Sequence, residues 1–138
     1  MLEQTEIDGV SLSKFLKDGK IDKKKLEEIV DRTRKGGAEI VKFLQKGSAF
    51  YAPAASGVEM AESYLKDQKK QLPCAVYLQG EYGVKNLYAG VPVIIGASGV
   101  EKIIELKLSD EEKKSFHQSI KAVEDLFSAA KKIDTNLN

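Results

Sequence analysis

The sequence has little of the chemistry on which secreted, metal-binding and disulfide-stabilised proteins depend. It contains one cysteine, one histidine and no tryptophan among 138 residues. The single cysteine, Cys74, cannot form an internal disulfide, so the chain suits a reducing compartment. One histidine and one cysteine in different segments give no metal-site spacing, and we expect no metal. The opening residues MLEQTEIDGV have neither a basic stretch nor an apolar stretch, so we expect no secretory signal peptide.

An excess of charge of either sign is also missing. The chain has 22 Lys and Arg against 21 Asp and Glu, a net charge of +1. This balance gives no support for nucleic acid or an anionic membrane as the main partner. No apolar run approaches the roughly 18–20 residues that cross a bilayer. We therefore expect a cytoplasmic protein with a single domain over residues 1–138, which is long enough to bury a core.

Helical periodicity dominates the first part of the chain. It predicts a short helix over Ser11–Asp18 and a longer one over Asp22–Leu44, with Asp22 as its N-cap. Gly36 and Gly37 interrupt the longer helix. A glycine inside a helix costs about 1 kcal/mol relative to alanine. The pair therefore predicts a kink, or a point where something approaches the backbone closely.

Small, uncharged residues fill the next segment, KGSAFYAPAAS, from Lys46 to Ser56. Such residues either pack closely against a neighbouring element or line a pocket that admits a small molecule. Pro53 suits the first turn of the following helix, where its missing N–H costs nothing. That helix continues with mostly small apolar residues as far as Leu65, which predicts close packing on a partner.

The pattern changes to strands at Leu72. The runs Leu72–Leu78, Leu87–Gly96 and Val100–Leu106 are rich in valine, isoleucine and tyrosine, and glycines punctuate them. The connections are too short for crossover helices, so we expect an antiparallel meander. Pro92, inside the second run, predicts a sheet edge or a bulge at that point.

The last helix has a clear beginning. Ser109 and Glu112 form the pattern of a capping box, and an apolar stripe follows as far as Lys132. The predicted fold class is therefore α+β. We expect a three-stranded antiparallel twisted sheet, covered on one face by the long helices Asp22–Leu44 and Ser109–Lys132.

The reactive side chains form no complete catalytic constellation. His117 lies one place off the apolar stripe of the last helix, which predicts a surface histidine rather than a general base. Cys74 lies on an apolar strand and is expected to be a buried, inert thiol. Gly96 and Gly99 follow a strand, but the Gly-x-Gly-x-x-Gly pattern is incomplete and another strand comes next. We expect a tight turn there rather than a phosphate-binding loop.

Two arginines flank the glycine pair in the sequence DRTRKGG. Arg32 and Arg34 could bind an acidic group at the predicted kink. A surface or subunit contact is the alternative that we favour, because arginine is common at protein interfaces.

Taken together, these segments resemble the C-terminal half of the lactate/malate dehydrogenase family, and in particular the lactate-dehydrogenase-like malate dehydrogenases of bacteria. The resemblance runs from about Val10 to about Lys132. The segments that carry it are RTRKGGAEIV (32–41), GSAFYAPAAS (47–56), MAESYLKD (60–67), LPCAVYLQGEYGVKNLYAGVPVIIGASGVEKIIEL (72–106) and the closing helix.

The resemblance implies roles for four residues. In this family the C-terminal domain packs against an N-terminal Rossmann domain, and the active site lies in the cleft between them. Gly36 and Gly37 would line the substrate side of the cleft. Ala49 stands where lactate-type members carry a threonine beside the substrate, and Pro53 would come near the nicotinamide ring. The small residues of the Lys46–Ser56 segment would then wall a pocket for a dicarboxylic 2-oxo acid and a flat cofactor ring.

The family's catalytic parts precede the matched region. Its Rossmann domain, nucleotide-binding glycines, substrate-binding arginines and catalytic histidine–aspartate pair have no counterpart in this sequence, and His117 does not match the catalytic histidine. We therefore expect a C-terminal substrate-binding and assembly domain that lacks its Rossmann domain. NAD would be bound mainly by that missing domain, and no catalytic residue is assigned here. Alone, the chain is expected to be inactive and to bind no cofactor.

Two functions of different classes follow. The first is part of an NAD-dependent malate dehydrogenase of the tricarboxylic acid cycle, which interconverts malate and oxaloacetate and assembles as a homo-oligomer. The second is a non-catalytic, self-associating module, or a remnant, that retains only the fold. An adjacent reading frame encoding the Rossmann half would favour the first function, and self-association without a partner would favour the second.

Overall fold

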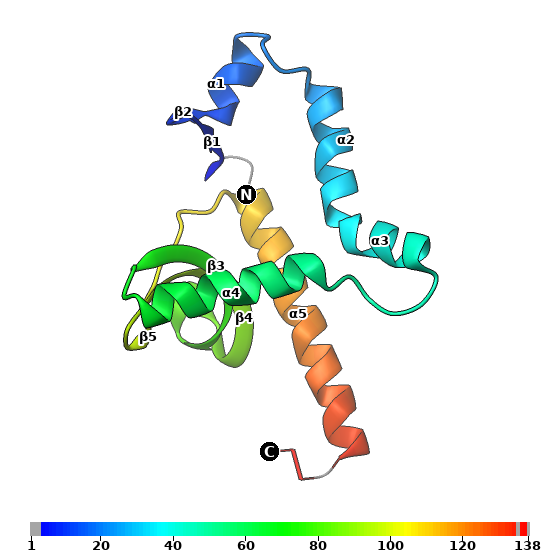
Figure 1. Cartoon of the computed structure of the whole chain (residues 1–138), viewed down its shortest axis with the longest axis vertical. Helices are drawn as coiled ribbons and strands as arrows, with labels where there is room; N and C mark the ends of the chain where they lie inside the picture. Colours follow the sequence, from blue (N-terminus) through cyan, green and yellow to red (C-terminus); the bar gives the residue numbers. More distant parts are fainter. Residues whose placement is uncertain (1–3, 135, 138) are drawn as a thin grey trace. The chain divides into compact units, whose positions relative to one another are not determined.

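The structure is a computed structural model that describes residues 4–134 and 136–137. The chain divides into two compact units, Met1–Ser56 and Gly57–Asn138 (Figure 1). Each unit is described by itself.

The first unit opens with a small hairpin and a short helix. Strands β1 (Glu6–Ile7) and β2 (Val10–Ser11) pair antiparallel. Both turn residues between them, Asp8 and Gly9, have positive φ, at 51° and 74°. Asp-Gly is a favoured pair for the two-residue turn of a hairpin, so the sequence indicated this hairpin although we did not predict it. Helix α1 (Leu12–Lys17) follows and confirms the short helix predicted there.

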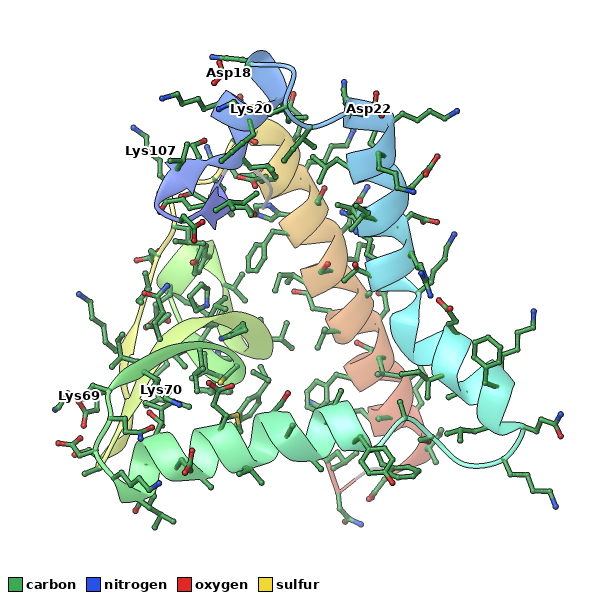
Figure 2. The ribbon with its side chains drawn as sticks, turned by 45° about the horizontal axis from the view of Figure 1, so that its top comes forward. Asp18, Lys20, Asp22, Lys69, Lys70 and Lys107 are labelled. Carbon is green, nitrogen blue, oxygen red and sulfur yellow. The ribbon has the colours of Figure 1, made fainter. Side chains whose placement is uncertain are left out.

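The predicted long helix is two helices. Helix α2 (Lys23–Arg34) begins at Asp22, labelled in Figure 2, whose carboxylate accepts a hydrogen bond of 2.7 Å from the N–H of Lys25. Helix α3 (Gly36–Leu44) follows after a single residue and runs in a different direction (Figure 1). The chain therefore breaks between two helices at the glycine pair, where the sequence predicted a kink.

Helix α4 (Tyr51–Leu65) begins in the first unit and continues into the second. Pro53 lies in its first turn, as predicted. Ser63, near the other end, is fully buried. Its hydroxyl donates to the carbonyl of Ile95 at 2.6 Å and accepts from the N–H of Lys70 at 3.1 Å. This one side chain ties α4 to two strands of the sheet.

The second unit contains the predicted antiparallel sheet, with strand order β3-β4-β5. The strands are β3 (Lys70–Gln79), β4 (Lys85–Gly96) and β5 (Gly99–Ile103), and the short 3₁₀ turn η2 (Glu81–Gly83) lies between the first two. At the start of β3, Lys69 and Lys70 lie together (Figure 2), and the ammonium of Lys69 is 3.0 Å from a carboxylate oxygen of Glu101 on β5. The core is one buried cluster of apolar side chains from the sheet, the turn before β4 and helix α5, namely Leu78, Val84, Leu87, Ala89, Val91, Val93, Ile95 and Ile120.

Pro92 lies in the central strand β4, one residue before the part of β4 that pairs with β5. Its carbonyl accepts a hydrogen bond of 2.8 Å from the N–H of Ile104, so its nitrogen also faces the β5 side. The ladder between β4 and β5 ends at the next residue, Val93, and the missing N–H therefore breaks no ladder bond there. A bulge does occur nearby, between Ile94 and Ile95.

Helix α5 (Asp110–Ile133) completes the second unit. The predicted capping box is present: Ser109 and Glu112 each accept, through the side chain, the backbone N–H of the other, at 3.3 Å. Ile120 is buried against the sheet, and Phe116 packs beside it. Cover of the same sheet by α2 and α3 stays a prediction, because those helices belong to the other unit.

Candidate functional site

The break between α2 and α3 is a tight elbow centred on Lys35. The N–H of Lys35 donates to the carbonyl of Asp31 at 3.1 Å and closes α2. The carbonyl of Lys35 accepts from the N–H of Glu39 at 2.9 Å and opens α3. Gly36 and Gly37 are therefore the first two residues of α3, on the far side of the elbow.

Nothing in the described chain requires glycine at these two positions. Neither residue has a φ in the left-handed region, and a Cβ built at either one meets no atom within 4 Å. Gly96 shows the contrast, because a Cβ there would come within 2.7 Å of the Asp67 carboxylate. The two glycines therefore leave the backbone at the start of α3 open to an approaching group.

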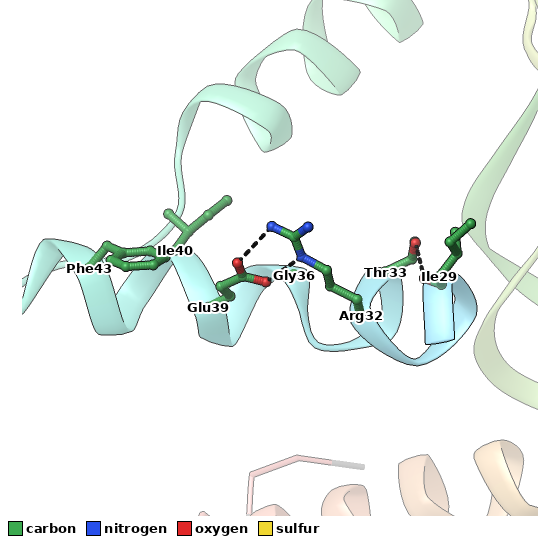
Figure 3. Close-up of a pocket in the computed structure, with 7 residues that line it drawn as sticks. All are labelled: Ile29, Arg32, Thr33, Gly36, Glu39, Ile40 and Phe43. Atoms are coloured by element: carbon green, nitrogen blue, oxygen red, sulfur yellow. Dashed lines mark hydrogen bonds and ion pairs between the residues drawn. The ribbon is translucent and has the colours of Figure 1, made fainter. Parts of the chain in front are cut away.

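An open hollow of about 470 Å³ lies at the elbow. Figure 3 shows its lining, in which Gly36 lies between the side chains of Arg32 and Glu39. Ile29, Ile40 and Phe43 make its apolar part. Phe43 is 77% exposed and Ile29 is 53% exposed, so this apolar lining faces outward.

An ion pair spans the elbow. Arg32 Nε donates to Glu39 Oε2 at 3.1 Å, and Nη2 donates to Oε1 at 2.9 Å. The hydrogen bonds, and then the opposite charge, raise the pKa of Arg32 and lower the pKa of Glu39. The sequence allowed Arg32 to bind an acidic group. It does bind one, but that group is the carboxylate of Glu39 in the same chain. On a continuous helix, residues seven positions apart are separated by about 10 Å along the axis, so this pair forms because of the elbow between α2 and α3.

A second, smaller hollow of about 100 Å³ lies beside the first. Ala49 lines it, together with the rings of Phe50 and Tyr51, whose centroids are 4.7 Å apart. Ile40 borders both hollows. The structure thus brings Gly36 and Ala49 to adjoining hollows of the first unit. Gly37 and Pro53 are exposed nearby but line neither hollow.

The other candidates have ordinary surroundings. His117 is exposed, and its Nδ1 lies 2.7 Å from the carbonyl of Lys113. Cys74 is half-buried, its Sγ is 3.4 Å from the sulfur of Met60, and desolvation raises the pKa of its thiol. Gly96 and Gly99 are paired across a tight turn of the β4–β5 hairpin. The predictions of a surface histidine and of a turn agree with these surroundings, whereas Cys74 is half-buried rather than buried.

The linings of the two hollows contain few reactive groups. Arg32 and Glu39 are the only members of the first lining that are charged at neutral pH, and they neutralise each other. Within residues 4–134 and 136–137, no cluster of three or more His, Cys, Asp or Glu side chains could hold a metal ion. The helices in the same residues also lack the combined length and apolar character of a membrane span.

Comparison with known proteins gives a consistent result. A model of the lactate/malate dehydrogenase, alpha/beta C-terminal domain, matches residues 1–133. Malate dehydrogenase of Pelagibacter ubique is 64% identical over 134 residues, which are 97% of this chain and 42% of the relative. Malate dehydrogenase of Caulobacter vibrioides is 52% identical over 137 residues, 99% of this chain and 43% of the relative. The chain therefore spans less than half the length of these relatives.

Solved structures agree with the sequence comparison. The crystal structure of Cryptosporidium parvum malate dehydrogenase superposes with a TM-score of 0.92 at 46% identity, over 96% of this chain and 42% of that one. Lactate dehydrogenase from Eimeria maxima, crystallised with NADH and oxamate, gives a TM-score of 0.93 at 42% identity, over 98% of this chain and 42% of that one.

Proposed function

Because the chain belongs to the lactate/malate dehydrogenase family, as its α/β C-terminal domain, we propose that it forms the substrate side of the active-site cleft in an NAD-dependent malate dehydrogenase. The observation that carries the proposal is the match to malate dehydrogenases at 64% and 52% identity over nearly the whole chain. The complete enzyme would interconvert malate and oxaloacetate in the cytoplasm, as a step of the tricarboxylic acid cycle. Residues 1–138 would act as one domain beside a Rossmann domain, in a homo-oligomer.

The substrate wall in this proposal consists of Gly36, Gly37 and Ala49. Two observations support it. The glycine pair leaves the elbow backbone open to an approaching group, and no neighbour within the described chain uses that space. Ala49 keeps the adjoining hollow small and apolar, with no charge of its own. A dicarboxylate would then take its charged partners from the Rossmann side, since Arg32 is already engaged by Glu39.

Pro53 is proposed to flank the cofactor. The residues around it, Ala49, Phe50, Tyr51 and Ala52, carry no charge at neutral pH and are suited to the side of a flat nicotinamide ring. In this proposal the segment contacts only the nicotinamide ring of NAD. It does not bind the pyrophosphate, because the sequence has no Gly-x-Gly-x-x-Gly turn to hold one. NAD, bound mainly by the Rossmann domain, would accept the hydride from malate. The part of this chain is to exclude water and to fix the substrate against that ring.

The test follows NADH absorbance with oxaloacetate as substrate. The 138-residue chain is assayed alone and then mixed with a separately expressed Rossmann half of a malate dehydrogenase. We expect turnover in the mixture only, because general acid–base help, worth about 10²–10⁴-fold, and the cofactor site come from the other half. Turnover by the chain alone, or none in a mixture whose halves do associate, would contradict the proposal.

A matched pair of variants tests the substrate wall. Ala49→Trp fills the small hollow and should abolish turnover in the mixture. Ala97→Trp introduces the same side chain into the exposed turn of the β4–β5 hairpin and should leave turnover unchanged. If both variants keep full activity, Ala49 does not line the substrate pocket.

A further inference from the structure

Apolar packing does little to fix the angle between α2 and α3. The apolar side chains that line the hollow at the elbow, Ile29, Ile40 and Phe43, are all exposed. Lys35, the residue between the two helices, makes no side-chain capping hydrogen bond to α3. The glycine pair comes next, and glycine leaves the backbone more conformational freedom than any other residue. The backbone and the apolar side chains therefore restrain the elbow only weakly.

One ion pair joins the two helices across this junction. Arg32, in the last turn of α2, donates two hydrogen bonds to the carboxylate of Glu39, in the first turn of α3, at 3.1 and 2.9 Å (Figure 3). Two parallel bonds between planar groups fix the relative orientation of those groups as well as their distance. In the described part of the chain, no other side-chain hydrogen bond or ion pair connects α2 with α3.

A neighbouring ion pair provides the contrast. The ammonium of Lys35 lies 2.8 Å from a carboxylate oxygen of Asp31, and both side chains are exposed. These two residues are one helical turn apart, at the end of α2, so their contact does not cross the elbow. Exposed ion pairs of either kind add little to the stability of a fold. What distinguishes the pair between Arg32 and Glu39 is that it joins two separate helices.

We propose that Arg32 and Glu39 are positioning residues, whose ion pair sets the angle of the elbow and so places the backbone of Gly36 and Gly37 against the substrate. Gly36 lies between the two charged side chains in the lining of the hollow (Figure 3). The ion pair would therefore form the substrate wall before the substrate arrives. This inference deepens the proposed function and rests on it for the substrate. Neither charged side chain contacts the substrate, because each is engaged by the other.

The physical consequence is an effect on apparent affinity. Without the ion pair the elbow would sample several angles, and the wall would be in place in only a fraction of the molecules. The apparent affinity for substrate falls by that fraction. Glu39→Gln keeps the size of the side chain and removes its charge, so KM for oxaloacetate should rise at least about threefold. Loss of folded protein would instead lower the maximal rate and leave KM unchanged, so KM is the informative constant.

The first test measures the elbow in the 138-residue chain alone. Nitroxide labels are attached at Lys24→Cys on α2 and Lys42→Cys on α3, both exposed positions, in a Cys74→Ser background. Electron–electron double resonance then gives the distribution of distances between the labels. The distribution should be narrow with the native pair, broader with Glu39→Gln, and unchanged with the matched control Asp31→Asn. Circular dichroism confirms that each variant is folded.

The second test measures KM in the mixture with a Rossmann half. Arg32→Gln, Glu39→Gln and the double variant should raise KM equally, because each removes the same ion pair and residues in contact are not additive. Asp31→Asn should keep the KM of the wild type.

Three results would overturn the inference. They are an unchanged distance distribution in Glu39→Gln, an equal effect of Asp31→Asn, and a KM for Arg32→Gln well above that for Glu39→Gln. The last result would make Arg32 a direct ligand of the substrate. A wild-type mixture without turnover contradicts the proposed function instead, and the distance measurement then decides the role of the ion pair by itself.

Discussion

At the helix elbow, the substitution Gly36→Ala should change the stability of the chain and the turnover of the mixture in opposite directions. Gly36→Ala adds a Cβ that meets no atom within 4 Å, at a helical position without positive φ. Alanine at a compatible position stabilises by about 0.4–1 kcal/mol, mainly by restricting the unfolded chain. For a domain of this size that amount raises the thermal midpoint by about 1–4 °C. The same methyl group would intrude on the proposed substrate wall, so turnover in the mixture with a Rossmann half should fall.

The assay is thermal unfolding by circular dichroism, with amide hydrogen exchange along α2 and α3 as the local readout. Gly99→Ala is the contrasting variant, because Gly99 has a φ of 88°. It should destabilise the chain by about 1–2 kcal/mol, since L-residues are strained in that region. If Gly36→Ala lowers the midpoint, the elbow needs glycine for a reason inside the chain, and the argument for an outside approach is refuted. If stability and turnover both rise, Gly36 does not face the substrate.

Three further predictions concern single side chains. Ser63→Ala should destabilise the second unit by about 1–3 kcal/mol in urea unfolding, because it leaves the carbonyl of Ile95 and a backbone N–H without their buried partner; an unchanged midpoint would show that water replaces the hydroxyl. The lowered pKa of Glu39 means that its ion pair stabilises the elbow at neutral pH and stops doing so as pH falls below the usual carboxyl range. The protection of α3 amides from hydrogen exchange, relative to their intrinsic rates at each pH, should therefore fall in acid in wild type, and Glu39→Gln should remove that component. Cys74, whose thiol pKa is raised by burial, should react with a disulfide reagent at pH 8 more slowly than the same thiol in urea; equal rates would show that the thiol is accessible in the fold.

The sequence determined those features that depend on neighbouring residues. Short connections between strand-type segments left an antiparallel meander as the compatible sheet. Ser109 and Glu112 specified the start of α5, since a capping box needs only residues three positions apart. The glycine pair predicted the break after α2 by local helix propensity alone. Family resemblance, carried by long segments in order, pointed to the C-terminal domain that the family match confirms.

Tertiary structure decided the features that depend on residues distant in the sequence. The central strand β4 accommodates Pro92 because the ladder that β5 forms with β4 ends one residue short of the proline. Arg32 is engaged by Glu39 because the elbow brings two separate helices together. Glycines that look alike in sequence also differ: Gly96 is required by carboxylates from a turn and a neighbouring strand, whereas Gly36 and Gly90 have open space around them. Alternation along a strand shows that two faces exist, but only contacts between distant segments determine which face is covered and which remains available to a partner.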